Sequence, residues 1–209
     1  MYPLMRRRMM MMESGGTPPQ PLPYDSKVEY LIGDGDAYID TGVYLDQSSY
    51  VRIDFSVTTI NVGRSLFGAR NAYTTKDFSW SLKSADNKVR RVYGTKTQES
   101  SGGLTDPSVR YNYKQDGRVL YNSNDGVIAT FSSQKFTCEY PTYLFAMNNA
   151  GTAMNVAEVK IYYAKFIGDK TLDLIPVRVG TVGYMYDQIS GTLFGNVGSG
   201  AFTLGPDTN

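Results

Sequence analysis

The chain has 209 residues, of which 21 are Lys or Arg and 20 are Asp or Glu, so its net charge near neutral pH is +1. This balance provides no field that attracts nucleic acid, and the aromatic residues are scattered rather than set in a basic stripe. The sequence contains no histidine, which excludes serine–histidine hydrolysis and histidine–zinc chemistry. No apolar run approaches the ~20 residues of a membrane-spanning helix.

The first 26 residues differ in composition from the rest and are expected to form an extended arm in front of one domain at 27–209. Four prolines between positions 18 and 23 favour an extended conformation. The apolar stretch at 9–12 ends at Glu13 and is too short for an export signal. The basic cluster before it is either a solubilising tail or a peg that anchors the chain in a larger assembly, and it consists of Arg6, Arg7 and Arg8.

Beyond the arm, β-strand patterns recur with turn residues between them, and no amphipathic helix is evident. The expected strands are 28–32, 37–41, 50–57, 65–69, 77–83, 88–93, 109–114, 118–121, 127–131, 141–147, 156–167, 171–178 and 182–186. Residues 98–107 are expected to form a loop, and 121–126 a hairpin turn. About thirteen or fourteen strands without helices predict an all-β fold, a two-sheet antiparallel jelly-roll sandwich.

Alternation within these strands predicts which faces are buried. In residues 50–57, every second side chain from Val51 to Val57 is apolar and the intervening ones are polar. Trp80 shares a strand face with Phe78 and Leu82, so it is expected in the core rather than as an exposed platform for a sugar ring. The lone cysteine, Cys138, lies among aromatic residues and is expected to be a buried, unreactive core residue.

The closing segment, 175–196, combines a strand, a hairpin turn with Gly191, and a short strand. With segments 29–42, 65–71, 143–148 and 202–207, it resembles the concanavalin A-like lectin/glucanase (LamG-like jelly-roll) domains encoded by phages and prophages of gut bacteria. The resemblance spans residues 27–207. It implies a jelly-roll fold, carbohydrate binding and a place on a phage particle.

The glucanases of this superfamily carry a Glu-x-Asp-x-x-Glu strand, which is absent from this sequence, so no enzymatic activity is expected. Asp34 and Asp36 are interpreted as turn formers. No cofactor is expected, and bound calcium is the alternative. Its candidate ligands are Asp34, Asp36, Asp40 and Asp125. Their spacing matches no defined calcium loop, so calcium is not favoured.

Sugar binding requires exposed rings together with planar amide or guanidinium donors. Loop edges offer such residues after strand 65–69, beside Arg90 and Arg91, and after strand 141–147. The candidate ligand-binding residues are Arg70, Asn71, Tyr73, Tyr93, Asn148 and Asn149. Residues 148–152 are equally compatible with a plain turn.

The sequence therefore predicts a non-catalytic, virion-associated protein that displays a carbohydrate-binding module for attachment to the host surface. Its expected partners are a cell-surface glycan and, through the arm, other virion proteins; a homo-oligomer is compatible with this view. The alternative is a structural decoration protein without glycan binding, because tyrosine-rich surfaces suit protein interfaces as well. A glycan hydrolase is the least favoured interpretation.

Overall fold

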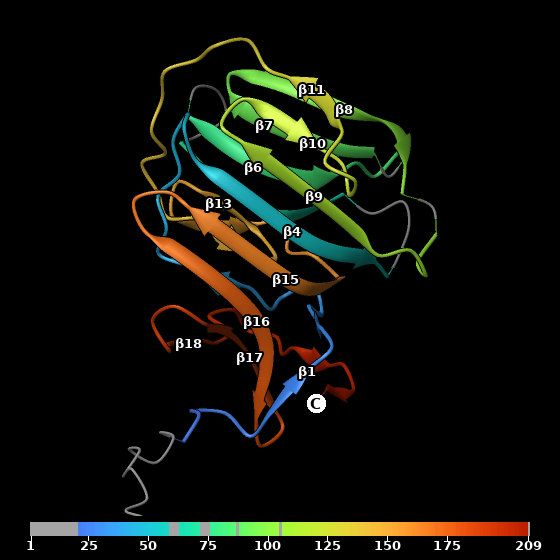
Figure 1. Cartoon of the computed structure of the whole chain (residues 1–209), viewed down its shortest axis with the longest axis vertical. Coiled ribbons are helices and arrows are strands. Elements are labelled where there is room, and N and C mark those ends of the chain that lie inside the picture. The colour runs from blue at the N-terminus through green and yellow to red at the C-terminus, as the bar shows by residue number, and fades with distance from the viewer. Residues whose placement is uncertain (1–20, 59–62, 72–75, 87, 105, 209) are drawn as a thin grey trace, which may run out of the picture.

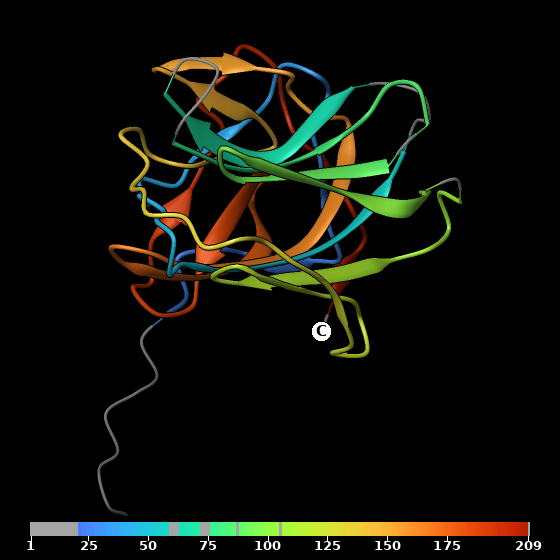
Figure 2. The same ribbon diagram turned by 90° about the horizontal axis from the view of Figure 1, so that it is seen from above.

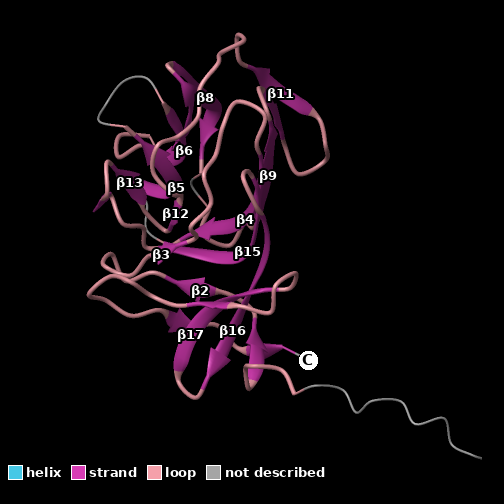
Figure 3. Cartoon of the chain, turned by 90° about the vertical axis from the view of Figure 1, so that its left-hand side faces the viewer, coloured by secondary structure: helices cyan, strands magenta, loops and turns pink. Residues whose placement is uncertain are grey.

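The computed structural model describes residues 21–58, 63–71, 76–86, 88–104 and 106–208. These residues form twenty strands and no helix, and the strands lie in two sheets that appear as two layers in Figure 2. Figure 3 shows the same chain as strands and loops only. The predicted all-β, two-sheet sandwich is confirmed.

The larger sheet contains twelve strands, and its main path runs β11-β10-β9-β4-β15-β16-β1-β20. Its strands are β1 (Ser26–Val28), β2 (Leu31–Ile32), β4 (Tyr50–Val57), β9 (Tyr111–Asp116), β10 (Val119–Tyr121), β11 (Val127–Thr130), β15 (Val159–Ile167), β16 (Thr171–Val179), β17 (Val182–Asp187), β18 (Leu193–Phe194), β19 (Thr203–Leu204) and β20 (Asp207–Thr208). Every pairing in this sheet is antiparallel. The long strands β4, β15 and β16 form its centre (Figure 1).

The smaller sheet contains eight strands, with the main path β14-β13-β5-β6-β7-β8. Its strands are β3 (Ile39–Asp40), β5 (Arg64–Arg70), β6 (Asp77–Leu82), β7 (Lys88–Gly94), β8 (Lys96–Gly103), β12 (Tyr143–Leu144), β13 (Met147–Asn149) and β14 (Thr152–Met154). Its pairings are antiparallel except for β13, which runs parallel to β5.

The core lies between the two sheets, where the predicted alternation holds. Val51, Ile53, Phe55 and Val57 of β4 are at most 1% exposed. From the smaller sheet, the buried ring of Phe67 packs 5.6 Å from that of Phe166 on the larger sheet. These apolar contacts hold the two sheets together.

Trp80 is fully buried, as predicted. Its indole Nε1 donates a hydrogen bond to Gln115 Oε1 at 3.0 Å, and this bond joins β6 to β9 across the core. The buried indole therefore has a partner for its one polar group, as buried tryptophans require.

The closing segment forms β16, β17 and β18, and its hairpin turn is confirmed, with Gly191 at φ +74°. The carboxylate of Asp187, which is 0% exposed, organises this turn. It accepts hydrogen bonds from the backbone N–H groups of Asp173 (2.8 Å), Ile189 (3.3 Å) and Ser190 (3.0 Å). One buried side chain thus connects the turn to the neighbouring strand β16.

Three expectations about strand boundaries are wrong. Residues 98–107 are not a loop throughout, because 96–103 form edge strand β8, whose Ser- and Gly-rich composition suits a solvent-facing edge. The expected strand 28–32 is split between β1 and β2, which pair with different partners. The expected strand 141–147 is broken by Phe145, whose φ is +69°.

The two ends of the described domain meet in the larger sheet. Strand β1 lies between β16 and β20 and pairs antiparallel with both. Arg178 of β16 donates two hydrogen bonds to the carboxylate of Asp207, Nε at 2.8 Å and Nη2 at 2.6 Å. The division into an arm and a sandwich stays a prediction, because Arg6, Arg7 and Arg8 lie outside the described residues.

Cys138 is a free thiol that is 2% exposed, which confirms its predicted burial. Burial, followed by the charge of Asp77, raises the pKa of the thiol to about 12. Because the thiolate is the reactive form, we expect Ellman's reagent to leave the native protein unmodified at pH 8 and to titrate one thiol per chain in denaturant. Fast reaction of the native protein would contradict this burial.

Candidate functional site

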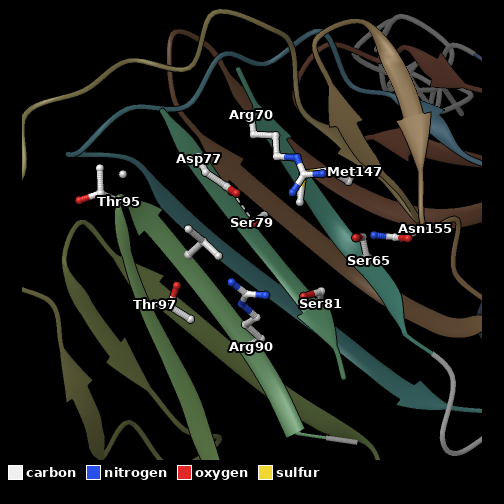
Figure 4. Close-up of a pocket in the computed structure, with 12 residues that line it drawn as sticks. Ser65, Arg70, Asp77, Ser79, Ser81, Arg90, Thr95, Thr97, Met147 and Asn155 are labelled. Atoms are coloured by element: carbon white, nitrogen blue, oxygen red, sulfur yellow. Dashed lines mark hydrogen bonds between the residues drawn. The ribbon is translucent and has the colours of Figure 1, made fainter. Parts of the chain in front are cut away.

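A polar cleft of about 430 Å³ lies on the outer face of the smaller sheet, on the side away from the core (Figure 4). Strands β5 to β8 form its floor, and residues around β13 and β14 form one wall. The lining residues are Ser65, Arg70, Asp77, Ser79, Ser81, Arg90, Val92, Gly94, Thr95, Thr97, Met147 and Asn155.

The floor of the cleft follows from the alternation of β6. Phe78, Trp80 and Leu82 point into the core, so Asp77, Ser79 and Ser81 point out into the cleft. Small side chains on this face leave room above the sheet.

Gly68 of β5 serves the same purpose. A Cβ atom at this position would lie 2.5 Å from the Cβ of Ser79 and 2.8 Å from the sulfur of Met147. Any larger residue would therefore force these two lining side chains to move, and glycine keeps this part of the cleft open.

Two guanidinium groups project over the floor from opposite sides of β6, with Ser79 between them (Figure 4). Arg70 stands at the end of β5, and its Nε donates a hydrogen bond to Asn149 Oδ1 at 2.7 Å. Its Nη2 lies 3.9 Å from the sulfur of Met154. These contacts with β13 and β14 fix the orientation of Arg70.

Arg90 comes from β7 and is exposed. Its cross-strand neighbour Glu99 binds Lys83 instead, with Oε2 3.0 Å from Nζ. Within the described part of the chain, the Arg90 guanidinium makes no hydrogen bond and no ion pair within 4 Å. It is therefore a cation at the cleft that is available to a ligand.

Asp77 is the one carboxylate among the lining residues, and it is 7% exposed. Burial raises its pKa to about 6, although the hydrogen bond from Ser79 Oγ and the charges of Arg70 and Arg90 act in the opposite direction. A strongly shifted carboxyl group in a cleft is a common mark of a functional site.

Ser65 is fully buried and lines the end of the cleft near Asn155. Its backbone N–H donates to the carbonyl of Asn155 at 2.7 Å, but its hydroxyl has no hydrogen-bond partner among the described residues. Because buried polar groups are normally paired, this hydroxyl is placed to bond a polar group that enters the cleft.

The structure places only some of the candidate ligand-binding residues derived from the sequence at the cleft. Arg70 lines the cleft and Asn149 positions it. Asn148 is 1% exposed and stabilises a turn, with Nδ2 donating to the carbonyl of Pro141 and Oδ1 accepting from the N–H of Gly151. Asn71 donates to the carboxylate of Glu139 and is not among the lining residues. Tyr73 lies outside the described residues.

Tyr93 does not occupy the expected loop edge. Its ring is 3% exposed and stacks on Phe131 in the core, and its hydroxyl donates to the carbonyl of Gln47 at 2.8 Å. The reason is strand alternation, which turns Tyr93 inward together with Arg91, whereas Arg90 and Val92 face the cleft.

The proposed turn-forming role of Asp34 is confirmed. Its Oδ1 accepts hydrogen bonds from the N–H groups of Asp36 (3.0 Å) and Ala37 (2.9 Å), and its Oδ2 accepts one from Ala201 (2.6 Å). Asp40 accepts from Gly42 N–H at 2.8 Å, and Asp125 lies 2.7 Å from Lys114 Nζ. Among the residues that the structure describes, no three acidic or cysteine side chains are placed to hold a metal ion together.

A second polar surface lies on the outer face of the larger sheet and combines tyrosine rings with cations. The guanidinium of Arg110 lies 4.3 Å from the ring centroid of Tyr162, and Tyr30 packs edge-on against Tyr162 at 5.4 Å. Arg110 also binds Asp54 at 2.8 Å. We call this surface, which includes Tyr30, Tyr162 and Arg110, the tyrosine face.

No protein-family model matches the chain, and no curated protein matches its sequence. No helix long and apolar enough to cross a membrane occurs in the described portion.

Proposed function

We propose that the chain is a non-catalytic carbohydrate-binding module and that the cleft on the smaller sheet receives the sugar. The observation that carries this proposal is the cleft itself, which joins two guanidinium groups, four hydroxyl side chains beyond Ser65 and one carboxylate in about 430 Å³. Volumes of this size are typical of small-ligand sites.

Sugar hydroxyls both donate and accept hydrogen bonds, so a sugar site needs both functions close together. Arg70, Arg90 and Asn155 supply N–H donors, Asp77 supplies an acceptor, and the Ser and Thr hydroxyls supply both. Val92 and Met147 add apolar surface to the lining. This mixture suits a ligand that is polyhydroxylated and has apolar ring faces.

The number of carboxyl groups in the cleft fits a protein that binds a sugar without hydrolysing it. Glycoside hydrolysis ordinarily requires two carboxyl groups on either side of the scissile bond. The lining residues include only Asp77, which can hydrogen-bond a hydroxyl but has no acidic partner there.

The resemblance to phage-encoded lectin-like domains extends the proposal to attachment at a host surface. In this view the protein is part of a virion, the arm with Arg6, Arg7 and Arg8 anchors it, and a cell-surface glycan is the partner. The fold analogy supports this step.

A structural role in an assembly is the second candidate, and the tyrosine face favours it. Tyrosine and arginine are enriched at protein interfaces, and this face presents both on the larger sheet. A structure of the protein in its native assembly, with the tyrosine face covered and the cleft empty, would support this alternative.

Blocking the cleft tests the main proposal. Ser81 faces outward from β6, so Ser81→Trp fills the cleft without entering the core. We expect the native protein to bind members of an array of neutral and acidic glycans, and Ser81→Trp to weaken that binding at least tenfold by calorimetry.

Asn112→Trp, which adds the same ring to β9 on the other sheet, should bind like the native protein. The proposal is wrong if no glycan binds, or if Ser81→Trp binds as well as the native chain.

A further inference from the structure

The charges in the cleft narrow the class of ligand. Arg70 and Arg90 contribute two positive charges to the lining, and Asp77 contributes at most one negative charge. Cys138, which lies near Asp77, is held as a neutral thiol because burial raises its pKa to about 12. The cleft therefore carries a net positive charge although the whole chain is almost neutral, at +1.

The two arginines are also prepared to bind an anion. Arg70 is oriented by Asn149 at 2.7 Å, so little side-chain freedom is lost when it binds a ligand. Arg90 has no hydrogen bond or ion pair with any described residue, because Glu99 is engaged by Lys83 at 3.0 Å. A planar guanidinium can bind a carboxylate through two parallel hydrogen bonds.

The rest of the lining accommodates the neutral part of such a ligand. The Ser79 and Ser81 side chains lie on the floor near Arg90, and the unpartnered hydroxyl of Ser65 lies at the far end with Asn155 (Figure 4). Ser79 Oγ already donates to Asp77, so an anionic group near the arginines leaves the Ser65 and Ser81 hydroxyls and the Asn155 amide to bind sugar hydroxyls.

We propose that the preferred ligand is an acidic saccharide, with the carboxylate of a uronic or sialic acid held by Arg70 and Arg90 above Ser79. This inference rests on the proposed sugar-binding function and specifies its ligand class. Arg90 would recognise the ligand by its negative charge, and the serine hydroxyls would recognise the sugar by hydrogen bonds.

The test compares matched acidic and neutral glycans. The native protein is applied to an array that holds neutral, carboxylate-bearing and sulfated glycans, and the strongest carboxylate-bearing ligand is then measured by calorimetry beside its methyl ester. We expect the acid to bind at least tenfold more tightly than the ester in 50 mM salt, and less so in 500 mM salt, because salt screens charge.

Arg90→Gln should lose at least tenfold in affinity for the acid and less than threefold for the ester. Arg90→Lys keeps the charge but not the paired donors, so its affinity for the acid should lie between that of the native protein and that of Arg90→Gln. The matched control is Arg118→Gln, which changes an exposed arginine in the turn between β9 and β10 of the other sheet and should bind normally.

The outcomes separate the two proposals. Binding of neutral glycans alone, equal binding of acid and ester, or an unaffected Arg90→Gln would overturn the acidic ligand and leave sugar binding in place. A preference for sulfated over carboxylate-bearing glycans would also overturn the assignment of a carboxylate. Failure of every glycan to bind would remove sugar binding and the acidic ligand together.

Discussion

Replacement of Asp187 by alanine is expected to lower the free energy of unfolding by about 3–5 kcal/mol. This carboxylate is fully buried and accepts three backbone N–H groups, from Asp173, Ile189 and Ser190. Hydrogen bonds to charged groups contribute ~1.5–3 kcal/mol each, and their loss leaves buried donors unpaired. Urea denaturation followed by tryptophan fluorescence would measure the loss.

Two variants serve as controls for this prediction. Asp187→Asn keeps one acceptor oxygen and should fall between the native protein and the alanine variant. Gln188→Ala removes an exposed side-chain hydrogen bond to Asp173 in the same turn and should cost less than 1 kcal/mol. An alanine variant at position 187 that is as stable as Gln188→Ala would show that the carboxylate does not hold the turn.

Asp187 also makes the stability of the fold depend on pH in the acidic range. Burial acts to raise its pKa, but the hydrogen bonds from Asp173, Ser190 and Ile189 together lower it below 3.8. The ionised form therefore stabilises the fold above pH 3.8, and this contribution disappears as the pH falls through the lowered pKa.

Asp77→Asn is expected to have the opposite effect and to stabilise the protein above pH 6. The pKa of Asp77 is raised from 3.8 to about 6, so the native state holds its proton more tightly than the unfolded chain. Each pKa unit corresponds to 1.36 kcal/mol, which gives a cost of about 3 kcal/mol for ionised Asp77. This cost is absent below pH 3.8 and complete once the pH has risen past 6.

The measurement is the unfolding free energy of both proteins from pH 4 to pH 8. The native protein should lose stability across this range relative to Asp77→Asn, whereas Asp116→Asn, an exposed aspartate on the other sheet, should follow the native curve. The groups facing Asp77 are Arg70 from β5, Arg90 from β7, Ser79 on its own strand and the neutral thiol of Cys138. If the unfolding free energies of the native protein and Asp77→Asn differed by the same amount at all pH values, this would contradict the raised pKa of Asp77.

An ionised Asp77 is expected to lower the stability of the fold, and the proposed ligand binding would give this carboxyl group a function. Residues at binding sites often reduce stability in exchange for function. If the cleft binds glycans as proposed, we expect Asp77→Asn to be more stable than the native protein and altered in its affinity for glycans.

Much of the fold follows from local patterns in the sequence. Strand 50–57 is predicted with its observed bounds because Val51, Ile53 and Phe55 alternate strictly with polar residues. The hairpin at 121–126 is predicted because Asn and Gly mark its turn, and β10 and β11 pair across it. Edge strand β8 is missed because its sequence is rich in Ser, Gly and Thr, which are equally common in loops.

The site is harder to predict because it depends on which strands are neighbours. Arg70 is found from its place at the end of a strand, but Asp77 and Arg90 meet it only because β5, β6 and β7 lie side by side. One available signal is the row Asp77, Ser79 and Ser81 opposite a row of large apolar residues, since small polar residues on a strand face indicate an open surface. Tyr93 shows the converse error, because strand alternation turns its ring into the core with Arg91 and away from Arg90, which faces the cleft.

The position of β1 between β16 and β20 determines how the domain would respond to mechanical load. Tension along β1 from its N-terminal side would shear both of its pairings at once, so the hydrogen bonds on both flanks would resist together. Tension between the segment before β1 and the end of β20 would instead peel these antiparallel strands apart one pair at a time, with the Arg178–Asp207 ion pair as the last restraint on β20. If the domain is held through its N-terminal segment while its cleft binds a surface as proposed, the force would act along β1. This is the stronger of the two directions.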